Sequence, residues 1–399
     1  MSNSIPFHLA GVSHHTAGVG VRERLVLSSD ETSAWLDRER HAGRSLVVLS
    51  TCNRLELFWW GDHDQEAGLR ALAQERGVSL DPRTVYRRDG LPALSHLFLV
   101  AAGLDSQVLG EHEIAGQVRR AHDQAREGGT TTWQLDAAFT AALASGRRVR
   151  RETALGKHPA SVASASVAHA KRCAGGSFSD KHVVVLGAGE AAEGLLRVLQ
   201  TEPRASLVVL ARTPERGEAL VAGATGSSAA WDALPAALAQ ADVVFAATAA
   251  IEPVLSCSML AAALDSRRSR SIVILDLAVP RNVDPLARDL RGVKLFDLDD
   301  LRLQHCPAAV GSAPALAEAE ALVRTELSQF GKMLRAREAA PHLAELHRLG
   351  ERLAQEETDR TLAELGPLSD GQEDVVRQMA ERLVRRLLYP ASQKLRGSL

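Results

Sequence analysis

Hydrophobic and polar positions divide the 399-residue chain into three regions. The first, residues 1–155, mixes two patterns: extended stretches from Phe7 and on both sides of Cys52, and helical spacing over 92–100 and 133–151. A period of two is typical of strands and a period near 3.6 of helices. We therefore expect an α+β domain here.

The second region, residues 156–306, carries short β-rich runs, "HVVVLGAG", "SLVVLAR", "ADVVFAAT" and "SIVILDLAV", separated by Ala- and Leu-rich segments of helical length. Strands that alternate with helices favour βαβ units and a parallel, Rossmann-like sheet. The third region, residues 307–399, has Ala, Leu, Glu and Arg at helical spacing. We expect a helical domain interrupted by four prolines: Pro314, Pro341, Pro367 and Pro390.

Composition and charge narrow the function classes. A hydrophobic content of 45% allows sizeable cores, and a net charge of −2 gives no global field toward nucleic acid or membrane, so any RNA contact must use local patches. The N-terminus shows no secretory signal, and no run approaches the roughly 18 apolar residues of a membrane span. We expect a cytoplasmic protein without a membrane segment. The four cysteines lack C-x-x-C spacing, which argues against disulfides and a zinc site.

A glycine-rich turn in the second region predicts a dinucleotide site. Gly187, Gly189 and Ala192 form a G-x-G-x-x-A pattern between a strand and a helix, where the backbone can approach a pyrophosphate. A purely structural glycine turn is the alternative. The helix that follows offers free N–H groups to phosphates. The candidate cofactor contacts are Gly187, Ala188, Gly189, Glu190, Ala191 and Ala192.

The end of the next strand favours NADPH over NADH. An NAD site usually places Asp or Glu there to bind the ribose 2′-hydroxyl, whereas this chain has Arg212 and Thr213, with Arg216 one turn later. A cation and a hydroxyl suit a 2′-phosphate. The alternative is that these residues belong to a solvated loop.

Cys52 in "STCNR" lies between two predicted strands and is either a small core residue or a nucleophile. The thiolate is the reactive form, and a nearby cation lowers its pKa. Arg54 could act in this way, or bind a substrate carboxylate as a planar fork. A cysteine beside a nicotinamide site suggests thiolate attack on an acyl group, followed by hydride reduction of the thioester.

Ordered motifs along the chain resemble those of the glutamyl-tRNA reductases: "GVSHHTAGVGVRERL", "LSTCNRLELF", "HLFLVAAGLDSQVLGEHEIAGQVRRA", "GAGEAAE", "ARTPERGEALV", "LDLAVPRNVDP", "LFDLDDL" and "LVRRLLYPASQKLR". The resemblance implies an enzyme that uses NADPH to convert glutamyl-tRNA to glutamate-1-semialdehyde and free tRNA, the first step of the five-carbon route to tetrapyrroles. It also implies that a Cys52 thioester is the intermediate and that hydrolysis is its side reaction without NADPH.

The resemblance carries roles over to individual residues. Cys52 matches the nucleophile, and His96 matches a histidine proposed as general base or proton donor, although a helix histidine is often structural. Arg54 matches a partner of the glutamate carboxylate, and His14 and His15 line the substrate side, with no metal expected. The full set of expected substrate contacts is Thr51, Asn53, Arg54, Ser106, Glu111, Glu113 and Gln117.

Glu113 departs from the family, which frequently has Gln at this position. A carboxylate there would repel an incoming glutamyl carboxylate unless Glu113 is protonated or paired. The role of Glu113 is therefore open.

Two arginine runs and the tail suggest partners. Both runs could contact tRNA phosphates, although most such runs are solvated faces. The first run comprises Arg147, Arg148, Arg150 and Arg151, and the second comprises Arg267, Arg268 and Arg270. The amphipathic C-terminal segment, with Leu383, Leu387 and Leu388 at helical spacing, is expected to pair in a homodimer, as in the family. Glutamate-1-semialdehyde aminomutase is a further candidate partner.

Two competing functions and one conformational expectation remain. The chain could be another NADP-linked dehydrogenase of the shikimate dehydrogenase type, or a nonenzymatic regulator that binds glutamyl-tRNA. Since hydride transfer needs near contact, we also expect a hinge between the cysteine and nucleotide domains, visible as an open gap between the two sites.

Overall fold

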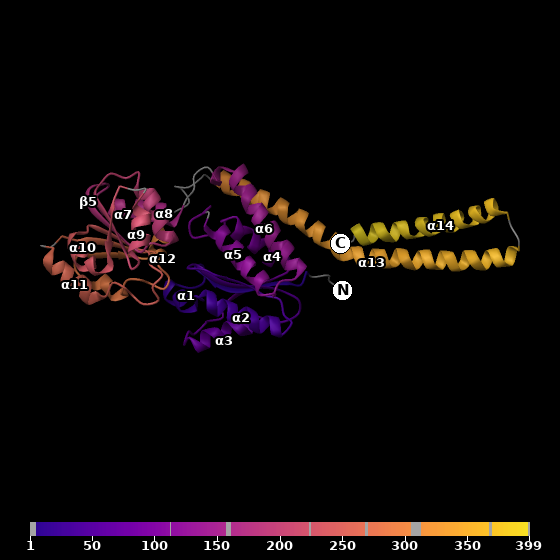
Figure 1. The fold of residues 1–399 in the computed structure, drawn as a ribbon, viewed down its shortest axis with the longest axis horizontal. Coiled ribbons are helices and arrows are strands. Elements are labelled where there is room, and N and C mark those ends of the chain that lie inside the picture. The colour runs from indigo at the N-terminus through magenta and orange to yellow at the C-terminus, as the bar shows by residue number, and fades with distance from the viewer. Residues whose placement is uncertain are drawn as a thin grey trace. The chain divides into compact units, whose positions relative to one another are not determined.

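The computed structural model describes residues 5–111, 113–156, 161–222, 225–267, 270–304, 313–366 and 369–397 (Figure 1). The chain forms two compact units, Met1–Arg324 and Thr325–Leu399. The first unit contains both an α+β portion and a parallel-sheet portion. The domain boundaries expected at residues 155 and 306 stay predictions.

The N-terminal portion is built on a four-stranded antiparallel sheet with the order β2-β3-β1-β4. The register of its central pair sets Ser13 opposite Arg54 and Phe7 opposite Trp60. This pairing brings the end of β1 beside the turn that holds Cys52. The strands are β1 (Phe7–Ser13), β2 (Val47–Ser50), β3 (Arg54–Trp60) and β4 (Tyr86–Asp89).

Six helices accompany this sheet: α1 (Val19–Leu25), α2 (Ser29–His41), α3 (Glu66–Glu75), α4 (Leu91–Ala101), α5 (Glu113–Glu127) and α6 (Trp133–Glu152). The helices predicted over 92–100 and 133–151 are confirmed as α4 and α6. The Phe58 ring of β3 meets the Phe139 ring of α6 edge-on with 5.5 Å between centroids, a favourable aromatic geometry. Successive residues of β1 and β3 are nearly all buried, so both faces of the sheet are covered.

The second portion is a six-stranded parallel sheet with the order β10-β9-β8-β5-β6-β7. Counted from its own first strand, this is the 3-2-1-4-5-6 order of a doubly wound dinucleotide-binding fold. The topology switches between β5 and β8, so the crevice for a nucleotide lies at their carboxyl ends. The strands are β5 (Phe178–Leu186), β6 (Arg204–Ala211), β7 (Ser227–Ala230), β8 (Val243–Ala246), β9 (Ile272–Asp276) and β10 (Val293–Phe296).

Both faces of the parallel sheet are buried. Val183 and Val185 of β5 join one apolar cluster, whereas Val184 and Leu186 join another, as the alternation of side chains along a strand requires. The surrounding helices are α7 (Val162–Cys173), α8 (Glu190–Leu199), α9 (Pro214–Val221), α10 (Leu234–Gln240), α11 (Cys257–Ser266) and α12 (Leu298–Gln304). Short 3₁₀ turns span Ala154–Gly156, Trp231–Ala233 and Pro285–Asp289.

The tail consists of two long helices, α13 (Ala313–Leu365) and α14 (Asp370–Gly397). Pro341 and Pro390 lie inside these helices, so the prediction that they break the helical pattern is wrong. Pro314 lies in the first turn of α13, where its missing N–H costs no hydrogen bond, and Pro367 lies outside the described residues.

Within the second unit, α14 runs back along α13 (Figure 1). Gly350 of α13 lies so close to α14 that a Cβ there would be 2.9 Å from the nearest Val384 side-chain carbon. Arg377 also pairs with Asp359 across the two helices at 3.2 Å. Among the described residues, no helix combines the length and apolar character that a membrane span requires.

Candidate active site

Cys52 lies in the three-residue turn between β2 and β3. The Thr51 amide donates to the Arg54 carbonyl at 2.8 Å, and the Thr51 hydroxyl accepts hydrogen bonds from the amides of Asn53 and Arg54 at 3.1 and 3.2 Å. The His14 amide donates to the Asn53 carbonyl at 2.9 Å. These bonds give Thr51 and Asn53 roles inside the turn, and their predicted substrate contacts remain untested.

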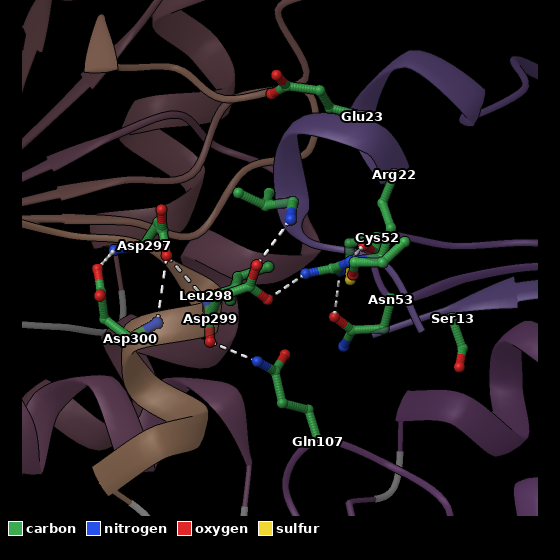
Figure 2. A network of polar contacts seen from close by, with 12 residues as sticks. Ser13, Arg22, Glu23, Cys52, Asn53, Gln107, Asp297, Leu298, Asp299 and Asp300 are labelled. Carbon is green, nitrogen blue, oxygen red and sulfur yellow. Dashed lines mark hydrogen bonds and ion pairs between the residues drawn. The ribbon is translucent and has the colours of Figure 1, made fainter. Parts of the chain in front are cut away.

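Arg22 of α1 is the side chain that holds this turn (Figure 2). Its Nη1 donates to the Cys52 carbonyl at 2.6 Å and to Asn53 Oδ1 at 3.0 Å, while its Nε donates to the Ala17 carbonyl at 3.2 Å. The side chain is almost fully buried, so the charge must be compensated. The compensating carboxylate is that of Asp299, the second residue of α12, which pairs with Arg22 Nη2.

The Cys52 thiol is half-buried, and its pKa is raised to about 12. Burial is the main cause; Glu111 and Glu113 raise the pKa further, whereas Arg22 lowers it. Arg22 is thus the cation that acts on the thiol, and the role expected of Arg54 in lowering this pKa is not supported. The sulfur is protonated at neutral pH in this state.

Arg54 belongs instead to a buried network. Its Nη1 pairs with Glu56 Oε1 at 2.8 Å and with Asp105 Oδ2 at 2.9 Å, and its Nη2 donates to the Asp105 carbonyl at 2.5 Å. Burial alone would raise the pKa of Glu56, but Arg54 and His96 lower it to about 2. The Arg54 Nε is buried without a partner among the described residues, and the predicted contact of Arg54 with a substrate carboxylate stays a prediction.

His96 of α4 is part of the same network. Its Nε2 lies 2.7 Å from Glu56 Oε1, and the Tyr86 hydroxyl donates to the same oxygen. The ring is buried, and its Nδ1 has no partner among the described residues. A carboxylate that orients a histidine is a common arrangement for a general acid or base, so the predicted role has a physical basis but stays a prediction.

Four further candidates lie on the segment before α5 and in the first part of this helix: Ser106, Glu111, Glu113 and Gln117. Burial is the main cause that raises the pKa of Glu111 to about 7, and the Ser106 hydroxyl opposes this effect. Burial and the nearby Glu190 also raise the pKa of Glu113, while Arg197 and Arg120 oppose this effect. Gln117 is half-buried one turn later on α5. Of these residues, Glu111 and Glu113 lie near enough to Cys52 to raise its pKa, whereas the predicted substrate contact of Gln117 stays a prediction.

The glycine-rich turn fits a dinucleotide for two different reasons. Gly187 has a φ of +111°, and a Cβ there would lie 2.4 Å from the Ala247 carbonyl oxygen, so only glycine suits the turn between β5 and α8. A Cβ on Gly189 would meet no protein atom within 4 Å, which leaves open space at the N-terminus of α8. Ala192 is fully buried in the core beneath the helix, as close packing of helix on strand requires.

The remaining nucleotide candidates are at the surface. Ala188 is half-buried, whereas Glu190, Ala191, Arg212 and Thr213 are exposed. Among the described residues, Arg212 has no ion-pair partner, so its guanidinium is available to a phosphate. Glu190 lies 3.4 Å from Arg120 of α5, a contact between the two portions of the first unit.

The two portions touch around Cys52, so the open gap expected of a hinged enzyme is not found among the described residues. Cys52 packs against the apolar cluster of the parallel-sheet portion that contains Val185 and Ala192. The hinge itself stays a prediction.

In the second arginine run, Arg267 is not available for the predicted tRNA contact. Arg267 is buried, and its guanidinium donates to the carbonyls of Leu238 and Ser271 at 2.7 and 3.0 Å. Arg270 pairs with Asp242 at 3.5 Å, and Arg268 lies outside the described residues. In the first run, Arg147 and Arg151 of α6 are exposed, which keeps the tRNA prediction open for that helix.

Sequence reasoning missed Arg22, Asp299 and Asp105 as site residues. The sequence does contain Arg22 and Asp299 within quoted motifs, "GVGVRERL" and "LFDLDDL", but charged residues in such stretches look solvated. Within the part of the chain that the structure describes, no cluster of His, Cys, Asp or Glu could hold a metal ion.

Comparison with known proteins agrees with this architecture. Residues 10–153 match the family model of the glutamyl-tRNA(Glu) reductase N-terminal domain, residues 168–303 that of shikimate / quinate 5-dehydrogenase, and residues 318–398 that of the glutamyl-tRNA(Glu) reductase dimerisation domain. The dehydrogenase match covers the nucleotide-binding portion alone.

Similar proteins cover nearly the whole chain. The chain is 35% identical to glutamyl-tRNA reductase 2 of Anaeromyxobacter dehalogenans, over 97% of this chain and 87% of that protein. It is 36% identical to glutamyl-tRNA reductase of Myxococcus xanthus, over 97% and 88%. Glutamyl-tRNA reductase from Methanopyrus kandleri is a similar solved structure, at 30% identity, 98% coverage of both chains and a TM-score of 0.46. The full-length matches and the N-terminal and C-terminal family models show that this chain belongs to the glutamyl-tRNA reductase family.

Proposed function

We propose that the chain is an NADPH-dependent glutamyl-tRNA reductase that forms glutamate-1-semialdehyde and free tRNA, the first step of tetrapyrrole precursor synthesis. One observation carries the proposal: the Cys52 turn of the N-terminal portion packs against the apolar core of the nucleotide-binding portion. An acyl group on Cys52 is thereby held at the junction with the portion that binds the reductant.

In the first step, the Cys52 sulfur attacks the ester carbonyl that joins glutamate to the terminal ribose of tRNA. A C–S bond forms and the C–O ester bond breaks, and the thiol proton leaves with the ribose oxygen. Because burial raises the pKa of the thiol, a base must take its proton as the C–S bond forms. His96 is our proposed proton carrier, and Arg54 our proposed anchor for the glutamate carboxylate.

NADPH, when bound, supplies the hydride that converts the thioester to the aldehyde and returns the Cys52 thiolate. Gly187 and Gly189 shape the turn where its pyrophosphate would lie, beside the N-terminus of α8. Arg212 and Thr213 at the end of β6 are proposed to bind the 2′-phosphate, which would select NADPH over NADH.

The tail supports a homodimer, in keeping with its dimerisation-domain match. We further propose a cytoplasmic location, contact of the exposed arginines of α6 with tRNA, and glutamate-1-semialdehyde aminomutase as a partner that receives the reactive aldehyde. The last of these rests on the family resemblance alone.

The test is an assay of purified protein with glutamyl-tRNA, with and without NADPH, alongside Cys52→Ser. We expect semialdehyde with NADPH, free glutamate without it, and neither product above background for Cys52→Ser. Binding of glutamyl-tRNA without turnover would instead favour a nonenzymatic regulator, and indifference to the tRNA would favour a small-molecule dehydrogenase.

A further inference from the structure

Several polar contacts connect the N-terminal and nucleotide-binding portions near Cys52. The Val19 amide at the start of α1 donates to Asp299 Oδ2 at 2.7 Å, and Arg22 Nη2 pairs with the other oxygen of the same carboxylate. Gln107 donates to the Leu298 carbonyl next to it (Figure 2). The start of α12 is therefore attached both to α1 and to the loop before α5.

Arg22 forms hydrogen bonds to both the Cys52 turn and α12. Its guanidinium reaches the Cys52 carbonyl and Asn53 Oδ1 with one nitrogen and Asp299 with another. Because a guanidinium is planar and rigid, displacement of Asp299 changes the position of the nitrogen that holds the Cys52 carbonyl. The Cys52 backbone and the nucleotide-binding portion are thus joined through two side chains.

Asp299 is itself fixed. Its amide donates to Asp297 Oδ1 at 3.0 Å, as does the amide of Asp300 at 3.2 Å, so Asp297 closes the first turn of α12. Both Asp299 carboxylate oxygens accept hydrogen bonds from the N-terminal portion. An amide in place of this carboxylate would turn one acceptor into a donor that faces another donor.

We propose that Arg22 and Asp299 are positioning residues that hold the Cys52 turn against the nucleotide-binding portion, so that the acyl group on Cys52 is reduced rather than hydrolysed. The inference rests on the proposed function for its substrate, but the contact itself does not. The same contact limits the access of water and reagents to the sulfur, because Cys52 is half-buried against the neighbouring core.

The first test is the partition of products from glutamyl-tRNA and NADPH in full-length protein. In Asp299→Asn, the ratio of semialdehyde to free glutamate formed should fall about tenfold. Arg22→Lys, which keeps the charge but loses the planar fork, should shift the ratio in the same direction. An unchanged ratio in Asp299→Asn overturns the proposal.

Glu23→Gln is the matched control. Glu23 lies on α1 next to Arg22 and pairs with Arg281 of the nucleotide-binding portion at 2.5 Å, yet no described hydrogen bond connects it to the Cys52 turn. We expect the product ratio of Glu23→Gln to change less than about twofold, as for other partly exposed ion pairs. A change as large as in Asp299→Asn would show that general docking, and not the Arg22 connection, protects the acyl group.

The second test needs no substrate and so separates this proposal from the proposed function. The rate of Cys52 alkylation by iodoacetamide at pH 8, followed by peptide mass spectrometry, should rise about tenfold in Asp299→Asn as the sulfur becomes exposed. Glu23→Gln should stay near the original protein, and thermal melting checks that all variants are folded. If alkylation in Asp299→Asn is unchanged while the protein reduces glutamyl-tRNA, the positioning role is wrong and the enzyme assignment stands. If alkylation rises but no variant, nor the original protein, reduces glutamyl-tRNA, the enzyme assignment fails alone.

Discussion

Arg22 Nη1 donates a 2.6 Å hydrogen bond to the carbonyl oxygen of Cys52. The buried Arg22 side chain therefore binds the backbone of the proposed nucleophile, and its other terminal nitrogen pairs with Asp299. The thiol itself has a pKa raised mainly by burial, and Arg22 is the cation that opposes this effect. Arg22 therefore fixes the position of the Cys52 backbone, but it does not produce a thiolate in the free protein.

The two glycines of the nucleotide turn should respond differently to alanine. Gly189→Ala should leave the melting temperature unchanged, because its Cβ meets no protein atom, but should weaken NADPH binding about tenfold or more by occupying the space for the pyrophosphate. Gly187→Ala should lower the stability by more than about 1 kcal/mol, since its φ is positive and its Cβ clashes with Ala247. Calorimetric melting and fluorescence titration with NADPH measure the two effects. Equal loss of stability in both variants would contradict this account.

Cofactor preference should depend on Arg212. Arg212→Ala should raise the KM for NADPH about tenfold or more and leave that for NADH nearly unchanged, because only NADPH carries the 2′-phosphate. Arg291→Ala is the matched control, since Arg291 is also exposed but precedes β10 at the amino ends of the parallel strands. Steady-state kinetics with both nucleotides decide the matter, and an equal effect on NADH would remove the 2′-phosphate role.

Glu111 should make the folded state less stable as the pH rises. Its folded pKa is about 7 against an ordinary value of 4.5, so between these values the folded state binds more protons than the unfolded state, and stability falls with increasing pH. Glu111→Gln should reduce this loss by about 3 kcal/mol between pH 4.5 and pH 8. The pKa of Asp276 is also raised to about 7, so the stability of Glu111→Gln should still fall with increasing pH, but less steeply.

Chemical unfolding at a series of pH values measures this slope. Glu127→Gln is the control, because Glu127 is exposed at the other end of α5. A slope that is the same in Glu111→Gln and in the original protein would show that Glu111 is ionised normally in the folded state.

The exposed apolar side chains of α14 should pair with a second copy. Leu383 is 52% exposed and Leu387 74% exposed, values that are unusual for two leucines on one helix face unless a partner covers them. Leu387→Asp should shift the protein from dimer to monomer in light scattering after size exclusion. Gln378→Asp, which adds the same charge at an exposed polar position of α14, should leave the dimer intact. A dimer that survives Leu387→Asp would place the interface elsewhere.

Local patterns were sufficient for most of the fold. The runs that became β5, β6, β8 and β9 are dense in Val, Ile and Leu, as strands buried on both faces must be. The short strands β4, β7 and β10 were missed, since "SSAA" of β7, for example, has no apolar alternation and pairs only because β6 lies beside it. Pro341 and Pro390 were misjudged because tertiary packing can keep a helix continuous through a proline.

The site was less accessible to sequence reasoning because its contacts are long-range. Cys52 and its turn could be predicted from neighbouring strands, and Gly187 from its motif. Arg22 and Asp299 are 277 residues apart, and no local pattern pairs them. For the same reason Arg54, two residues from Cys52, was given a role at the thiol, although its guanidinium faces Glu56 and Asp105.

The central claim is that Cys52 carries the glutamyl group, and mass spectrometry of the trapped protein tests it most directly. Full-length protein is mixed with glutamyl-tRNA without NADPH, quenched in acid within seconds, and digested. The account predicts a glutamyl adduct on the peptide that contains Cys52, which is lost on addition of NADPH before the quench and is absent from Cys52→Ser. Semialdehyde formation by Cys52→Ser, or an adduct on another residue that NADPH discharges, would contradict it.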